Sequence, residues 1–184
     1  MFVEISKDAV LFYKALEDIW CAERTYEGSP NNAVWSCCQA VEKIMKGFLQ
    51  CFGEDCGNTH DLNVILEYVE DKNKFQKDVL EAIHNLALYD QRLRYKNIRT
   101  DPTTQNALEA ITDAKLILSA FSNHDKCSAP ISEAQEVHTK MLRKLQYRPS
   151  RALRHLSPAT YVPTVMETPR ASKQVAEDER QQAE

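Results

Sequence analysis

Five basic or aromatic residues near the middle of the chain have the chemistry of a phosphate-binding site. They fall within eight positions: Arg92, Arg94, Tyr95, Lys96 and Arg99. A guanidinium can contact phosphate oxygens in a bidentate way, and a tyrosine ring can stack on a base. We therefore predict that this segment binds a nucleotide or RNA. The alternative is that these are solvated charges, with Arg94 paired to a carboxylate such as Asp90 or Glu42.

Two upstream lysines are candidates for the same site. Lys43 and Lys46 are three residues apart, so they share one face of a helix. If that helix lies beside the basic segment, both ammonium groups would line a groove for phosphate. The lysines are therefore grouped with the five residues above as predicted nucleotide- or RNA-binding residues.

His60 and Asp61 form a second polar pair. A histidine and a carboxylate can act in acid–base catalysis, but a polar pair at a helix start more often caps backbone amides. We expect the capping role, and we expect His84 to be a satisfied histidine at the edge of the core. No metal site and no cofactor are predicted, because no group of His, Cys, Asp and Glu has convincing metal-binding spacing. The six cysteines are expected to be reduced thiols.

A third basic group lies toward the end of the chain. Between His138 and His155 there are six basic residues and no acidic one, here called the basic arm: Lys140, Arg143, Lys144, Arg148, Arg151 and Arg154. Such an arm could contact nucleic-acid phosphates in a salt-sensitive way. It could equally dock on an acidic bundle, or remain a solvated tail.

The elements that must position these residues are helices. Apolar residues recur at spacings of three and four, and strand patterns are nearly absent. The expected helices span residues 6–26, 32–52, 62–69, 74–93 and 103–122. The clearest apolar stripe runs from Val34 to Phe52, with Glu42, Lys43 and Lys46 mainly off it. An extra helix is possible within residues 126–147. Its weak apolar pattern spans residues 132–146, after a break predicted at Pro130.

The predicted fold class is therefore all-α, an up-and-down bundle of about five helices. We place the bundle at residues 1–125, the extra helix within 126–147 and a largely disordered tail at 148–184. Residues 1–125 hold 20 acidic and 13 basic residues, whereas 126–184 hold 7 and 10. There is no run of eighteen apolar residues and no secretory signal pattern at the N-terminus, so a cytoplasmic protein without a membrane helix is expected.

Three motifs in order resemble those of the HEPN domain family. They are Gln39-Ala40-Val41-Glu42-Lys43 on the second predicted helix, His60-Asp61-Leu62 before the third, and Tyr89 followed by Arg94-Tyr95 at the end of the fourth. The resemblance covers about residues 5–123. It implies a helical bundle that usually dimerises through its long helices, with a role in nucleotide or RNA biology. Some members cleave RNA as toxins, and some are encoded beside a minimal nucleotidyltransferase.

The ribonuclease members of that family resemble one another in an Arg followed, after four to six residues, by His. No His follows Arg92 or Arg94 before Asp101, and the literal match from Arg148 to His155 lies in the predicted tail. We therefore predict no catalytic residues and favour a dimeric binding module that acts with a partner such as a nucleotidyltransferase, in a toxin–antitoxin-like context. The alternatives are a divergent metal-independent endoribonuclease using His60 or His155, and a structural dimerisation domain.

Overall fold

The computed structural model describes residues 4–95 and 101–144, with the backbone alone at residues 92–95. Over these residues the chain is all-α, which confirms the predicted fold class. Its elements are η1 (Lys7–Ala9), α1 (Val10–Thr25), α2 (Pro30–Cys51), α3 (Leu62–Glu70), α4 (Lys77–Tyr95), α5 (Thr104–Ser122) and α6 (Asp125–Lys144). The predicted tail at 148–184 lies outside the described residues. No helix among those described has both the length and the apolar character needed to cross a membrane.

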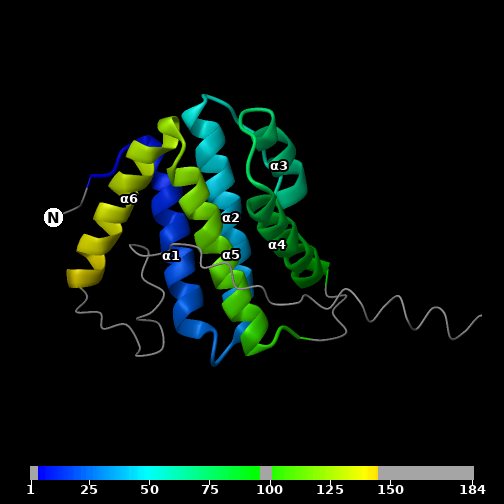
Figure 1. Ribbon diagram of the computed structural model, residues 1–184. Helices are drawn as coiled ribbons and strands as arrows, with labels where there is room; N and C mark the ends of the chain where they lie inside the picture. The colour runs from blue at the N-terminus through cyan, green and yellow to red at the C-terminus, as the bar shows by residue number, and fades with distance from the viewer. Residues whose placement is uncertain (1–3, 96–100, 145–184) are drawn as a thin grey trace, which may run out of the picture. The chain divides into compact units, whose positions relative to one another are not determined.

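The helices run up and down around α2. Figure 1 shows α1, α2 and α5 side by side, with α6 next to α1 and with α3 and α4 at the opposite edge. Every other α-helix contacts α2. Its position explains why α2 is buried on most of its surface while the flanking helices bury one stripe each.

Close packing of α1 on α2 depends on Gly47. A Cβ atom added at Gly47 would lie 3.0 Å from the Phe12 ring and 3.3 Å from the Leu11 Cβ. Phe12 is fully buried, so its ring has no solvent to move into. The absence of a side chain at Gly47 therefore lets α1 and α2 approach one another closely.

Aromatic rings fill the core at the end of the bundle where α2 ends. The Phe75 and Phe121 rings stack at 4.4 Å between centroids, and Phe48 packs edge-on against Phe121 at 5.1 Å. These rings join α2, α5 and the residues just before α4. Packing of this kind between aromatic rings adds stability beyond the area that the rings bury.

The ends of the helices follow their sequence signals. Gly53 adopts a positive φ of 74° after α2, and the amides of Gly53 and Glu54 donate to the carbonyls of Gln50 and Leu49. These two bonds form a Schellman motif. At the start of α5, Thr103 and Asn106 form a capping box.

The extra helix is longer than its predicted pattern. It begins at Asp125 rather than Ser132, and Pro130 lies inside it rather than ending it. The prediction of a break at Pro130 was wrong because Cys127, Ile131 and Ala134 are all buried against the bundle. Their packing offsets the hydrogen bond that a proline in a helix cannot donate. The helix α6 contacts α1, α5, η1 and α2.

Candidate functional site

A buried carboxylate organises the polar residues on one face of α2. Glu42 is only 6% exposed. Its Oε1 accepts hydrogen bonds from Lys46 Nζ at 3.0 Å and interacts with His60 Nδ1 at 2.8 Å. The sequence pattern had placed Glu42 mainly off the apolar stripe, so its burial is a correction. His60 reaches Glu42 from the loop before α3.

His60 and Asp61 have different roles. Asp61 is the N-cap of α3, where its side chain accepts from the Asn63 amide at 2.9 Å. His60 instead contacts Glu42, and its side chain remains 59% exposed. His84 is exposed rather than at the edge of the core, and its Nδ1 lies 3.2 Å from Asn63 Oδ1.

Cys56 lies in the loop that follows α2 and is electrostatically coupled to the same cluster. Burial raises the pKa of the Cys56 thiol, and the nearby Lys46 ammonium partly offsets this. The thiol is therefore mainly protonated near neutral pH, and it does not have the lowered pKa of a reactive cysteine. The cluster formed by Glu42, Lys46 and His60, here called the Glu42 cluster, is ionic rather than nucleophilic.

Lys43 faces α1, away from the Glu42 cluster. Its Nζ contacts Asp18 Oδ2 at 2.5 Å, and both side chains are about three-quarters covered. Burial raises the pKa of the Asp18 carboxyl, although the Lys43 ammonium opposes that rise. Both lysines predicted to bind phosphate are thus paired with carboxylates of their own chain.

The two predicted parts of the phosphate site lie far apart along the bundle. Cys38 Sγ lies 3.4 Å from the Leu86 carbonyl oxygen, and Phe48 packs against Phe75, so α2 and α4 run antiparallel. Lys46 is eight residues beyond Cys38, and Arg94 is eight residues beyond Leu86 in the opposite direction. At the rise of an α-helix their backbones are about 24 Å apart along the axis.

The end of α4 lies instead at the end of the bundle where α2 and α5 begin (Figure 1). Asn31 Nδ2, in the first turn of α2, donates to Asp101 Oδ1 at 3.1 Å, just before α5. The backbones of Arg92, Arg94 and Tyr95 belong to α4, whereas Lys96 and Arg99 lie outside the described residues. The first turns of α2 and α5, whose dipoles favour anions, therefore lie toward the same end of the bundle as the last turn of α4.

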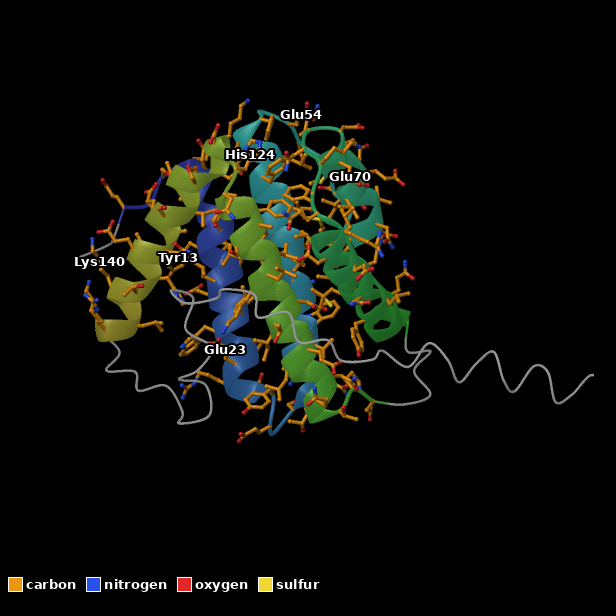
Figure 2. The ribbon with its side chains drawn as sticks, in the orientation of Figure 1. Tyr13, Glu23, Glu54, Glu70, His124 and Lys140 are labelled. Atoms are coloured by element: carbon orange, nitrogen blue, oxygen red, sulfur yellow. The ribbon has the colours of Figure 1, made fainter. Side chains whose placement is uncertain are left out.

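The described part of the basic arm lies on α6. Arg143 and Lys144 are exposed in its last turn, and Lys140 pairs with Glu136 at 2.5 Å. Figure 2 shows Lys140 on the outer side of α6 and Tyr13 on the side where α6 meets α1. The other members, Arg148, Arg151 and Arg154, lie outside the described residues.

Sequence reasoning named Glu42 and Asp90 as possible partners of Arg94 and did not predict their burial. Both are buried, and they are the buried charged residues in the described part of the chain. Glu42 could have been noticed because it precedes Lys46 by one turn within a largely apolar helix. Among the described residues, no three His, Cys, Asp or Glu side chains could hold a metal ion together.

Comparison with known proteins identifies one family. The model of the HEPN domain matches residues 9–124, which comprise η1 in part, α1 to α5 and the turn after α5. No curated protein and no solved structure matches the chain.

Proposed function

The chain belongs to the HEPN family, and from this premise we propose that it is a nucleotide- or RNA-binding module whose phosphate contacts come from the end of α4. HEPN membership supports a role related to nucleotides or RNA, or to interaction with another molecule. The observation that carries the narrower proposal is that α4 ends toward the end of the bundle where α2 and α5 begin.

The residues that contribute cations there are Arg92, Arg94, Lys96 and Arg99, with Tyr95 as a stacking side chain. Two helix N-termini add partial positive charge at the same end of the bundle. Lys43 and Lys46 contribute less in this proposal, because Asp18 and Glu42 already neutralise them. The exposed side chains of the basic arm on α6 add a second, sequence-independent attraction to nucleic acid.

The proposed module works as a cytoplasmic homodimer and acts with a partner protein such as a minimal nucleotidyltransferase, in a toxin–antitoxin-like context. This part of the proposal rests on what HEPN domains have in common. A mass measurement in solution tests dimerisation, and co-purification with the product of a neighbouring gene tests the partner.

Binding of short single-stranded RNA and of mononucleotides tests the proposal directly. The variant Arg94→Ala is expected to weaken binding by about tenfold, the loss of one charge-assisted contact. The matched control is Lys77→Ala, at the other end of α4, where the lysine side chain is 90% exposed. The control should bind as the wild type does. Absence of binding by the wild type, or equal losses in both variants, would rule out this site.

A second candidate function is supported by one observation, the contact of Glu42 with His60. A carboxylate on Nδ1 favours the tautomer with a basic Nε2, the arrangement used by general bases. The divergent, metal-independent endoribonuclease is therefore retained as the alternative. RNA cleavage in chelator should be lost in His60→Asn and kept in His84→Asn, whose histidine also has a side-chain partner. Intact RNA after long incubation with the wild type would reject this function.

A further inference from the structure

Two thiols meet where the end of α2 contacts the first turn of α6. Cys51 is the last residue of α2, and Cys127 is the third residue of α6. Their side chains are hydrogen-bonded to one another. Cys127 is fully buried, whereas Cys51 is partly exposed. The two thiols therefore form a pair of which one member can be reached from solvent.

The residues beside the two cysteines hold the same ends of α2 and α6 together. The Phe52 and His124 rings lie 5.4 Å apart between centroids, and Lys126 Nζ lies 4.2 Å from the Phe52 ring centroid (Figure 2). The Cys127 amide also donates to the His124 carbonyl at 2.9 Å. Contacts on both sides of the thiol pair thus restrain the two backbones close together, as a disulfide bond requires.

The two thiols differ in how readily they ionise. Burial raises the pKa of the Cys51 thiol, and the hydrogen bond from Cys127 opposes that rise. Burial and the interaction with Cys51 both raise the pKa of the Cys127 thiol, to well above its ordinary value. Cys51 is therefore the thiol that ionises first. It is also the one that an external oxidant can reach, so Cys51 is suited to attack and Cys127 to resolve.

The helix that carries Cys127 lies outside the region matched by the HEPN family. The match covers residues 9–124, and α6 begins at Asp125. Buried apolar side chains attach α6 to the bundle, and the Glu133 carboxylate accepts hydrogen bonds from the amide and the hydroxyl of Ser6. All of these contacts are non-covalent. A bond between Cys51 and Cys127 would add a covalent link between the matched bundle and this additional helix.

We propose that Cys51 and Cys127 form a reversible disulfide bond that fastens α6 to the bundle under oxidising conditions. The oxidant is a low-molecular-weight disulfide, for which oxidised glutathione is the probe. In the structure all six cysteines are free thiols, which is the reduced state of this site. The site does not depend on nucleotide or RNA binding, so it stands or falls separately from the proposed function.

The reaction consists of two thiol–disulfide exchanges. In the first, the Cys51 thiolate attacks one sulfur of oxidised glutathione, whose disulfide bond breaks and releases one glutathione thiolate. In the second, the Cys127 thiolate attacks Cys51 Sγ and releases the other glutathione thiolate. The protons of the two protein thiols pass through solvent to the two leaving thiolates. The two electrons given up by the protein thiols thus reduce one glutathione disulfide to two glutathione thiols.

Incubation of the folded protein with excess oxidised glutathione, followed by acid quenching and peptide mass spectrometry, tests the bond. The wild type should yield one peptide pair joined through Cys51 and Cys127, and dithiothreitol should separate the pair. Cys127→Ala should instead retain glutathione on Cys51, because it has no resolving thiol. Cys56→Ala is the control and should form the bond, since cleavage after Lys46 and Lys72 leaves Cys51 and Cys56 in one peptide.

Amide hydrogen exchange and thermal unfolding show whether the bond fastens α6. Oxidation should slow exchange over residues 125–144 several-fold in the wild type and leave Cys51→Ala unchanged. It should also raise the Tm of the wild type by roughly 10 °C, because the bond closes a long loop in the unfolded chain. Absence of the Cys51–Cys127 bond after prolonged incubation of the wild type would overturn the proposal. A bond that changes neither exchange over α6 nor Tm would contradict its fastening role.

Discussion

The two halves of α2 differ in what surrounds their polar and aromatic side chains. In the C-terminal half, Lys43 and Lys46 are paired with Asp18 and Glu42, and Gly47 lies tightly against α1. In the N-terminal half, Trp35 is partly exposed, and Asn31 Nδ2 donates to Asp101 Oδ1 just before α5. The C-terminal half, residues 42–51 and here called the closed half, has both of its lysines paired within its own chain. The N-terminal half, residues 30–41, has no lysine or arginine and begins at the end of the bundle toward which α4 ends.

This difference shows that lysines with helical spacing do not by themselves make a phosphate site. A phosphate that contacted Lys46 would have to compete with the buried Glu42 carboxylate, which would then lose a charged partner. A ligand at the end of α4 would not compete with the Glu42 carboxylate for Lys46. We therefore assign a role in stability to the closed half, and the proposed phosphate contacts stay with the end of α4.

The largest loss of stability is expected when the Glu42 carboxylate is removed from the closed half of α2. Glu42→Ala is expected to lower the free energy of unfolding by about 3 kcal/mol, because Lys46 and His60 would both lose a charged partner beside a buried position. Urea unfolding measures this loss. The control is Glu54→Ala, which removes an exposed partner of Lys72 and should cost under about 1 kcal/mol. Similar losses in the two variants would show that the Glu42 cluster is not important for stability.

A smaller loss is expected from crowding the contact between α1 and α2. Gly47→Val places branched carbons against the buried Phe12 ring and should destabilise the protein by about 2 kcal/mol. Gly28→Val is the matched control, because no atom lies within 4 Å of a Cβ atom at Gly28. Thermal unfolding of both variants tests the difference. A stable Gly47→Val protein would mean that α1 and α2 can separate without cost.

The smallest effect on stability is expected from a change in pH. It arises at the contact between α6 and α1 and not on α2. Burial lowers the pKa of His138, whose ring packs edge-on against Tyr13, while Glu17 and Glu23 oppose this shift. The folded protein therefore binds fewer protons than the unfolded chain below the ordinary histidine pKa of about 6.5. Stability should fall as pH drops through that value and level off below the lowered pKa of His138.

Urea unfolding at several pH values between neutral and mildly acidic measures this dependence. His138→Gln should reduce the slope, because the variant has no proton to bind at this position. Ligand binding at the end of α4 should not change in this variant. A slope identical to that of the wild type would remove His138 from the account.

Most of the fold was predictable because its signals are local. The stripe from Val34 to Phe52, the glycine after α2 and the Thr103 cap all depend on residues within one or two turns. The start of α6 was also readable in principle, since Cys127, Ile131, Ala134 and Val137 continue one buried face through Pro130. The prediction gave too much weight to the low helix preference of Pro130 and too little to the packing of this buried face.

The site was less predictable because its contacts join distant parts of the chain. Glu42 contacts His60, eighteen residues later, and Lys43 is neutralised by Asp18, twenty-five residues earlier. Neither contact can be inferred from the spacing of residues within one helix. The separation of Lys46 from the end of α4 likewise follows from the antiparallel register of α2 and α4, which a single sequence does not specify.

The salt dependence of RNA affinity tests most directly whether recognition belongs to the end of α4. The double variant Arg92→Ala/Arg94→Ala is compared with Lys43→Ala/Lys46→Ala, after thermal unfolding has shown that both are folded. The slope of log affinity against log salt should become shallower by about 1.4 in the arginine variant, about 0.7 for each lost phosphate contact, and should not change in the lysine variant. A shallower slope in the lysine variant alone would place the phosphate site on α2 and contradict the account.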